Sequence, residues 1–273
     1  MRISLVTPCL NQASFIRATL DSVLNQNHDG LEYVVVDGGS TDGTLAVLDD
    51  YQDSLAALVV EPDGGMYEAV AKGFAKSSGE VMGWINADDI HLPWTLSVVA
   101  EVFASFPEVE WITSLHPLAM DERGRVVRGR SRRRGFSAAE YLAGGYFPAP
   151  ERPGALWIQQ ESTFWRRSLW ERAGGFDPDL KAAGDFALWG RFFAQARLVG
   201  VDTPLAAFRR RAGQLSRSGR YEAEAAAALK RLGGRPRGAV GGWLAWAAER
   251  FTTAGGGQVC RWDWDAGRWR LDG

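Results

Sequence analysis

Four short apolar runs near the start of the chain, each followed directly by a polar or glycine-rich segment, limit its fold most strongly. The runs cover residues 3–6, 33–36, 55–60 and 81–85. Patterns typical of helices separate them, at residues 14–25, after a capping Asp42, and at residues 66–76. Strands that alternate with helices predict an α/β fold with a mostly parallel sheet and helices on both faces.

The polar segments that follow the four runs lie at residues 7–11, 37–43, 61–65 and 86–89. Ligands of such sheets bind outside the carboxyl ends of the strands, so we expect the four segments to line one crevice. The last segment holds Asp88 and Asp89 side by side. An isolated Asp-Asp pair is more often a solvated turn. Because polar segments also follow the three other predicted strands, we favour a Mn²⁺ or Mg²⁺ site that neutralises a nucleotide diphosphate.

Two other acids lie in glycine-rich segments at predicted strand ends. Asp37 is placed where it could accept hydrogen bonds from a base or a ribose, and Gly39 permits close backbone approach to a ligand. Asp63 is followed by two glycines in the same way. Ordinary Asp-Gly turns are the alternative for both. Lys72, on the next helix, could face the crevice, although a solvated helix lysine is the commoner outcome.

Composition and charge narrow the class of protein. The 273 residues carry a net charge of −2, which argues against a general nucleic-acid binder. Only two cysteines occur, Cys9 and Cys260, at opposite ends of the chain, which fits a reducing cytoplasm better than a disulfide framework. No stretch approaches the roughly 18 apolar residues of a membrane span. We therefore expect a cytoplasmic protein whose membrane contact, at the inner face, is peripheral.

The second half of the chain is less regular. An arginine-rich stretch at residues 123–134 is predicted to be an exposed hairpin or loop, and residues 160–165 a buried strand. The chain changes character beyond residue 217, which predicts a main domain at 1–217 and an extension at 218–273. Within the extension we expect helices at residues 221–232 and 243–251 and a hairpin at residues 260–271.

Several segments together resemble the inverting family 2 glycosyltransferases, especially bacterial enzymes of exopolysaccharide and colanic-acid-type assembly. They read TPCLNQ at 7–12, VDGGSTDGT at 36–44, DGGMYEA at 63–69 and NADD at 86–89. The resemblance in order and spacing is specific over residues 1–95. It continues more thinly through residues 160–164, 174–177 and 184–189, and fades after about residue 216.

The resemblance implies a GT-A fold, a Rossmann-like sheet with a nucleotide-sugar half at 1–95 and an acceptor half at 96–217. It implies that Asp37 binds the base or ribose, and that the nucleotide site is also lined by Thr7, Pro8 and Asn11. Asp88 and Asp89 match the metal and ribose acids of the family. Asn86 departs from the usual aspartate at its position; it can bind ribose but is a poorer metal ligand, so metal binding rests on Asp88 and Asp89.

The catalytic base implied by the resemblance is Asp185. An inverting transfer needs a group that removes the proton of the acceptor hydroxyl, on the face opposite the leaving diphosphate. Asp185 follows Gly184 at the start of a predicted helix, a position that also suits an N-cap. Glu161 is the alternative base, and His91 is a weak candidate for a third metal ligand.

The predicted function is transfer of a sugar, with inversion, from a nucleotide-diphosphate sugar to a glycan or lipid-linked acceptor in polysaccharide biosynthesis. UDP is the expected nucleotide. The arginine-rich stretch could contact an anionic acceptor, and one arginine of residues 209–211 could contact phosphate. A nucleotidyltransferase and an inactive nucleotide-sugar-binding module are the alternatives. The oligomeric state is left open.

Overall fold

The computed structural model describes residues 1–147, 157–212, 214, 219–235 and 257–273. The helices are α1 (Ile16–Leu24), α2 (Thr44–Asp49), α3 (Met66–Ala75), α4 (Thr95–Ser105), α5 (Ala138–Leu142), α6 (Arg167–Ala173), α7 (Gly184–Phe193) and α8 (Arg220–Arg231). The strands are β1 (Ile3–Cys9), β2 (Leu31–Asp37), β3 (Ala57–Val60), β4 (Val81–Trp84), β5 (Ile90–His91), β6 (Trp111–Ser114), β7 (Leu118–Met120), β8 (Val126–Gly129), β9 (Phe164–Arg166), β10 (Leu198–Val201), β11 (Ala206–Arg209), β12 (Val259–Asp263) and β13 (Arg268–Asp272).

The larger of the two sheets in the described part of the chain has nine strands, in the order β13-β12-β10-β6-β9-β4-β1-β2-β3. Most neighbouring pairs are parallel. The exceptions are β9, which is antiparallel to both β4 and β6, and β13, which is antiparallel to β12. The predicted α/β fold with a mostly parallel sheet is therefore confirmed. Because helices cover both faces, β1 and β4 are buried along their whole length.

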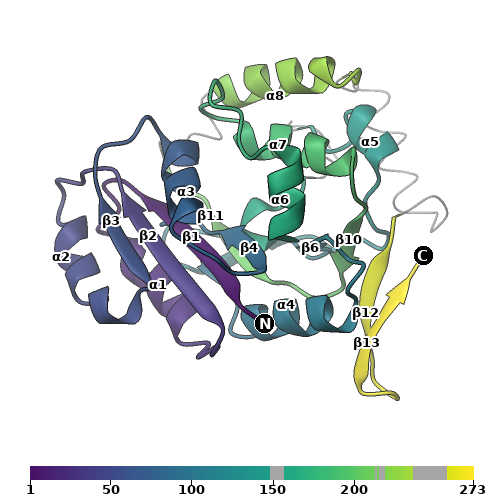
Figure 1. The fold of residues 1–273 in the computed structure, drawn as a ribbon, viewed down its shortest axis with the longest axis horizontal. Helices are drawn as coiled ribbons and strands as arrows, with labels where there is room; N and C mark the ends of the chain where they lie inside the picture. Colours follow the sequence, from purple (N-terminus) through teal and green to yellow (C-terminus); the bar gives the residue numbers. More distant parts are fainter. Residues whose placement is uncertain (148–156, 213, 215–218, 236–256) are drawn as a thin grey trace.

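Two hydrophobic clusters lie on opposite faces of this sheet. Figure 1 shows helices that cover these faces, with α6, α7 and α8 above the sheet and α4 below it. One joins the sheet to α3, α6, α7 and α8 and contains the stacked and edge-on rings of Trp84, Trp111, Trp165 and Trp189. The other joins it to α1, α2 and α4. Alternate strand residues divide between the two clusters, as Val81 and Met82 do, since successive side chains point to opposite faces. The tryptophans of this region therefore serve as core.

A smaller sheet, in the order β5-β11-β7-β8, lies beside the end of β4. Its edge is a hairpin of β7 and β8, as expected for the arginine-rich stretch, and all four residues of β8 are exposed. Arg132, further along the same stretch, is buried and not exposed as predicted. Its guanidinium is buried against the Phe136 ring and pairs with Glu140 at 2.8 Å, because the chain turns back into the core at this point.

The prediction of a strand at residues 160–165 is wrong in its first half. Residues Gln160–Ser162 form a 3₁₀ turn, and the strand is Phe164–Arg166. The buried polar side chains explain the difference, because Gln160 donates to the Trp84 carbonyl at 2.6 Å and Ser162 to Gln159 at 2.8 Å. Such side-chain bonds stabilise a turn in place of a sheet ladder.

The end of the chain adds to the main sheet. The predicted hairpin is confirmed as β12 and β13, and β12 pairs in parallel with β10. Helix α8 packs on α7. The helix predicted at residues 243–251 lies outside the described residues, and the division at residue 217 stays a prediction. Among the described residues, no helix is both long and apolar enough to cross a bilayer.

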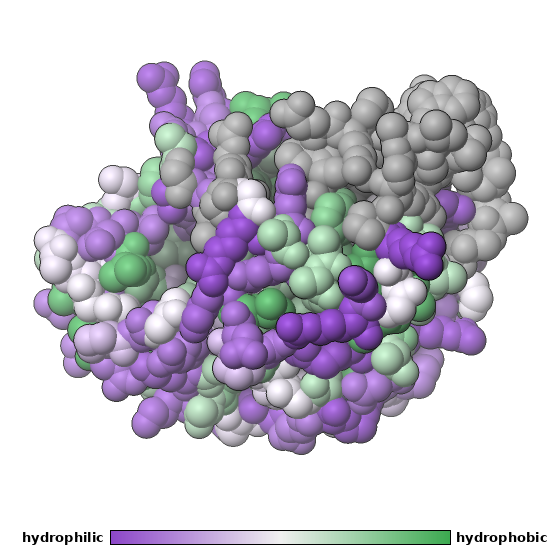
Figure 2. Space-filling view, turned by 90° about the horizontal axis from the view of Figure 1, so that it is seen from above, coloured by the Kyte–Doolittle hydropathy of each residue, from purple (hydrophilic) through white to green (hydrophobic). Residues whose placement is uncertain are grey.

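The described part of the surface on the α8 side of the molecule is mostly polar. Figure 2 shows hydrophilic side chains over much of the described surface there, with hydrophobic ones in small groups.

Candidate active site

The carboxyl ends of β1, β2 and β3 meet at one edge of the sheet. Cys9 pairs with Asp37, and Asp37 with Val60, so the polar segments after these strands begin at the same level. Strand β4 lies on the other side of β1, where Ile85 donates to the Val6 carbonyl at 2.9 Å. The predicted convergence of the four segments follows from this register.

The Asp37 carboxylate organises the loop that follows β2. Its Oδ1 accepts hydrogen bonds from the Gly39 and Ser40 amides at 2.9 and 2.7 Å, and its Oδ2 accepts one from the Ser40 hydroxyl. Gly39 has a φ of 94°, which favours glycine. Asn11, at φ 52°, ties the loop after β1 to this one, because its Oδ1 accepts from the Thr41 amide at 2.9 Å. The two loops form one rigid wall.

Thr7 and Pro8 are buried within β1 beneath that wall. The Thr7 hydroxyl bonds the Tyr33 hydroxyl at 2.8 Å. This bond joins β1 to β2 in the interior of the sheet.

The segment after β3 approaches the Asp37 loop closely. A Cβ at Gly38 would lie 2.8 Å from the Asp63 Oδ2, which shows how closely the two segments approach. Lys72 of α3 pairs with Glu61 at 3.0 Å and with Glu68 at 3.3 Å. Its ammonium group is thus held by two carboxylates beside the Asp63 segment.

Asp88 and Asp89 face different surroundings. Asp89 is fully buried. Its Oδ1 accepts a hydrogen bond from the main-chain amide of Arg209 at 2.7 Å, and its Oδ2 accepts one from the side-chain amide of Asn86 at 3.3 Å. Burial raises the pKa of Asp89 well above its usual range, and the nearby Glu161 and Asp88 carboxylates raise it further. Asp88 keeps some exposure, and its Oδ2 accepts from the Arg211 Nε at 2.6 Å.

Arg209 fastens the smaller sheet to the Asp88 segment. Its Nε donates to the Asp88 carbonyl at 2.6 Å and its Nη1 to the Glu122 carbonyl at 2.8 Å. The guanidinium lies over the Phe15 ring, 5.1 Å from the centroid. Arg209 is buried, so its charge serves the architecture of the site.

Asp185 lies in the second half of the chain, at the first turn of α7. Its Oδ1 accepts from the Tyr67 hydroxyl at 3.0 Å, and its Oδ2 accepts from the Tyr221 hydroxyl at 2.8 Å. Burial raises the pKa of Asp185, and the two tyrosine hydrogen bonds oppose that rise. The fit is close, since a Cβ at Gly184 would lie 2.9 Å from the Tyr67 ring.

Glu161, the alternative base, lies deeper. It is 3% exposed, and its Oε1 accepts from the Gln159 amide at 2.8 Å. Burial is the main cause that raises the pKa of Glu161 to about 7. His91 meets the Glu161 main-chain carbonyl through Nε2 at 3.0 Å, and burial lowers the pKa of His91 to about 4. The imidazole is thus neutral at pH 7 and engaged with the main chain.

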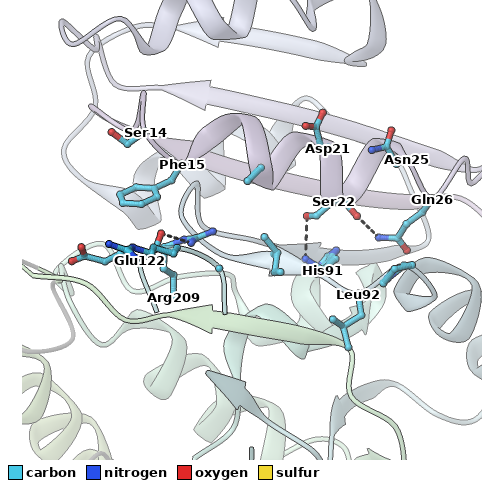
Figure 3. A pocket seen from close by; sticks show the side chains of 15 residues that line it. Ser14, Phe15, Asp21, Ser22, Asn25, Gln26, His91, Leu92, Glu122 and Arg209 are labelled. Atoms are coloured by element: carbon cyan, nitrogen blue, oxygen red, sulfur yellow. Dashed lines mark hydrogen bonds between the residues drawn. The ribbon is translucent and has the colours of Figure 1, made fainter. Parts of the chain in front are cut away.

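A groove of about 680 Å³ opens on the other side of Arg209. Figure 3 shows Phe15 and Ser22 of the α1 region facing His91, Leu92 and Arg209 across it. None of the predicted donor-site residues lines this groove.

The comparisons with known proteins agree with this architecture. The model of the family described as "Glycosyl transferase family 2" matches residues 4–125. An uncharacterized glycosyltransferase of Mycobacterium tuberculosis is 31% identical over 202 residues, which cover 72% of this chain and 69% of that protein. The chain belongs to glycosyltransferase family 2. A "PGL/p-HBAD biosynthesis glycosyltransferase" of Mycobacterium bovis is 35% identical, over 72% of this chain and 71% of that one.

Solved structures share the fold. Staphylococcus aureus TarS 1–349 in complex with UDP-GlcNAc has a TM-score of 0.66 at 18% identity, over 85% of this chain and 66% of that one. Glucosyl-3-phosphoglycerate synthase of M. tuberculosis, in complex with Mn²⁺, UDP-glucose and phosphoglyceric acid, has a TM-score of 0.57 at 21% identity, over 86% and 81%. These enzymes have GT-A folds, which confirms the predicted fold class. Family membership also favours a glycosyltransferase over a nucleotidyltransferase.

The residues beside Asp88 fit a divalent cation that is shared with a substrate. No group of three or more His, Cys, Asp or Glu side chains in the described part of the chain could hold a metal alone. Mg²⁺ and Mn²⁺ sites of phosphate-transfer type use one or two carboxylates and complete their shell with phosphates and water. Asp88 supplies one carboxylate, and the buried Asn86 Oδ1 has no hydrogen-bond partner among the described residues.

Sequence reasoning missed two groups that the structure places at Asp185. Tyr67 lies only four residues after Asp63, within a segment already singled out, but its hydroxyl points to the other half of the chain. Tyr221 is the second residue of α8, beyond the segments that resemble the family. The sequence around a tyrosine near the start of a helix gives no local signal that its hydroxyl will bond a distant carboxylate such as Asp185.

Proposed function

We propose that the chain transfers a sugar from a UDP-type nucleotide sugar to a glycan or lipid-linked acceptor, with inversion and with the help of Mn²⁺ or Mg²⁺. The observation that carries the proposal is the position of Asp185. A carboxylate from the second half of the chain lies against Tyr67, directly beyond the Asp63 segment of the donor crevice. Membership of family 2 supports a transferase at this crevice.

The donor side is a preformed wall of loops. The Asp37 and Asn11 loops and the Asp63 segment would hold the base and ribose, with Gly39 open to close approach. Asp88 faces the site while Asp89 is enclosed by protein donors, which favours Asp88 as the carboxylate that meets the metal. A cation bound there would neutralise the charge of the departing diphosphate.

The acceptor side supplies the base. As the acceptor oxygen bonds to the anomeric carbon and the bond to the diphosphate oxygen breaks, the acceptor's proton passes to Asp185. A pKa raised by burial brings this carboxylate closer to the working pH and strengthens it as a base. Tyr67 and Tyr221 each donate to one oxygen, which fixes the direction of the remaining lone pairs.

The edge hairpin suits an anionic, lipid-linked acceptor at the inner face of a membrane. Val126 and Val127 are each 57% exposed, and they lie between the exposed Arg125 and Arg128. Apolar tips flanked by arginines bind anionic lipid surfaces. Arg209 ties this hairpin to the Asp88 segment, so a docked hairpin would keep the donor crevice near the lipid.

The test separates binding from transfer. Titration calorimetry with UDP and Mn²⁺ should give the same affinity for wild type and Asp185→Asn, while radiolabelled transfer from UDP-sugars to membrane lipid extracts falls at least about a hundredfold. Asp179→Asn is the matched control, because this nearby aspartate is exposed. Loss of UDP binding in Asp185→Asn would point to a structural role. Undiminished transfer would exclude Asp185 as the base.

A further inference from the structure

Arg211 forms an ion pair with Asp88, the carboxylate that the proposed function assigns to the metal. Its Nε lies 2.6 Å from the Asp88 Oδ2, and the two side chains are 23% and 11% exposed. The guanidinium also lies over the Phe15 ring, 5.6 Å from the centroid, and its Nη2 is 3.4 Å from the Gln12 Oε1. The negative charge of Asp88 is therefore paired with a cation of the protein itself.

Arg209 and Arg211 differ in how firmly they are held. Arg209 is buried and donates to main-chain carbonyls of Asp88, Asp121 and Glu122. Arg211 lies beyond the end of β11, keeps contact with solvent, and has Asp88 as its carboxylate partner. Its two other side-chain hydrogen bonds, to the Ala212 carbonyl and the Gln12 Oε1, are long, at 3.4 Å each. Arg211 is thus the arginine that can leave without dismantling the sheet.

We propose that Arg211 holds the place of the divalent cation at Asp88 until a donor diphosphate arrives. The inference rests on the proposed function, in which Asp88 meets the metal. A guanidinium and a divalent cation repel each other at one partly buried carboxylate. A diphosphate offers Arg211 two or more anionic oxygens, which a planar guanidinium binds well. The diphosphate therefore draws Arg211 away from Asp88 as it brings the metal in.

The consequence is a thermodynamic coupling between metal and diphosphate. Metal alone must displace Arg211 and binds weakly, whereas each partner strengthens the binding of the other by the same factor. Arg211 acts here as a positioning residue, since its effect on the metal passes through Asp88. The coupling would keep the site from filling with metal when there is no donor to activate.

The test measures Mn²⁺ binding to the donor-free protein by calorimetry or by the paramagnetic resonance of free Mn²⁺. Arg211→Gln should bind Mn²⁺ about five- to tenfold more tightly than wild type, and should bind UDP without metal more weakly by a similar factor. Arg211→Lys should stay near wild type for Mn²⁺, because it keeps the charge. Arg210→Gln is the matched control, since Arg210 is exposed. Circular dichroism and the Tm confirm that each variant is folded.

The outcomes separate this inference from the proposed function. Equal Mn²⁺ affinity in wild type and Arg211→Gln, with Asp88→Asn still weakening Mn²⁺ binding in the presence of UDP, overturns the role of Arg211 alone. If Asp88→Asn leaves Mn²⁺ binding with UDP unchanged, the metal assignment itself is wrong.

Discussion

The buried acid Glu161 makes a sharp prediction about stability, and the test needs no substrate. Its pKa is raised from 4.5 to about 7, chiefly by burial. The unfolded chain releases this proton near pH 4.5, whereas the folded protein keeps it up to about pH 7. Folding therefore takes up a proton between these values. The stability that Glu161 contributes is complete below about pH 4.5 and is lost as pH rises through about 7.

The size of the loss follows from the two pKa values. At about 1.4 kcal/mol for each pH unit, the interval from 4.5 to about 7 corresponds to about 3 kcal/mol of unfolding free energy. Glu161→Gln removes the titration and keeps an oxygen that can accept from the Gln159 amide. The variant should therefore be more stable than wild type at pH 8 and close to it, or slightly less stable, at pH 5.

Urea unfolding followed by tryptophan fluorescence from pH 4.5 to 8.5 measures the difference directly. The difference in unfolding free energy between Glu161→Gln and wild type should grow with pH and level off above about pH 8. Glu108→Gln, a change at an exposed acid, should show no such trend. Parallel curves for Glu161→Gln and wild type would falsify the reasoning, because they would mean that Glu161 titrates alike in the folded and unfolded states.

Two further predictions concern the proposed base, Asp185, and the core. Tyr221→Phe removes the 2.8 Å hydrogen bond that stabilises the Asp185 carboxylate. The acid limb of the pH profile of kcat/KM should therefore shift to higher pH by about 0.5–1 unit. A lower rate with no shift of this limb would mean that Tyr221 has a purely structural role. Gly73→Ala would place a Cβ 2.5 Å from the Val6 Cγ1 where α3 crosses the sheet, and should lower the unfolding free energy by about 1–3 kcal/mol in urea titrations. A neutral result there would show that α3 can move away from β1 freely.

Much of the structure of residues 1–95 was predictable because its sequence signals are local. The strand ends are marked by glycine and aspartate in turns that close within a few residues, as at Asp37, whose carboxylate accepts from residues two and three positions later. The helix after Asp42 is present as predicted, but its N-cap is Gly43 and not Asp42, whose carboxylate accepts from the Thr44 main-chain amide at 3.0 Å. The strand predicted over residues 160–162 is a turn, because Gln160 bonds the distant Trp84 carbonyl while Ser162 bonds Gln159 within the turn.

The sequence by itself determined the α/β alternation and the convergence of four polar strand ends, since periodicity and turn chemistry operate over a few residues. It named Asp88 and Asp89 together but could not distinguish them. Only the tertiary structure separates the two, because β11 arrives from over a hundred residues away to enclose Asp89 and to set Arg211 against Asp88. The same holds for Asp185, whose tyrosine partners come from α3 and α8. Contacts of this kind depend on how distant elements pack, and no local pattern encodes them.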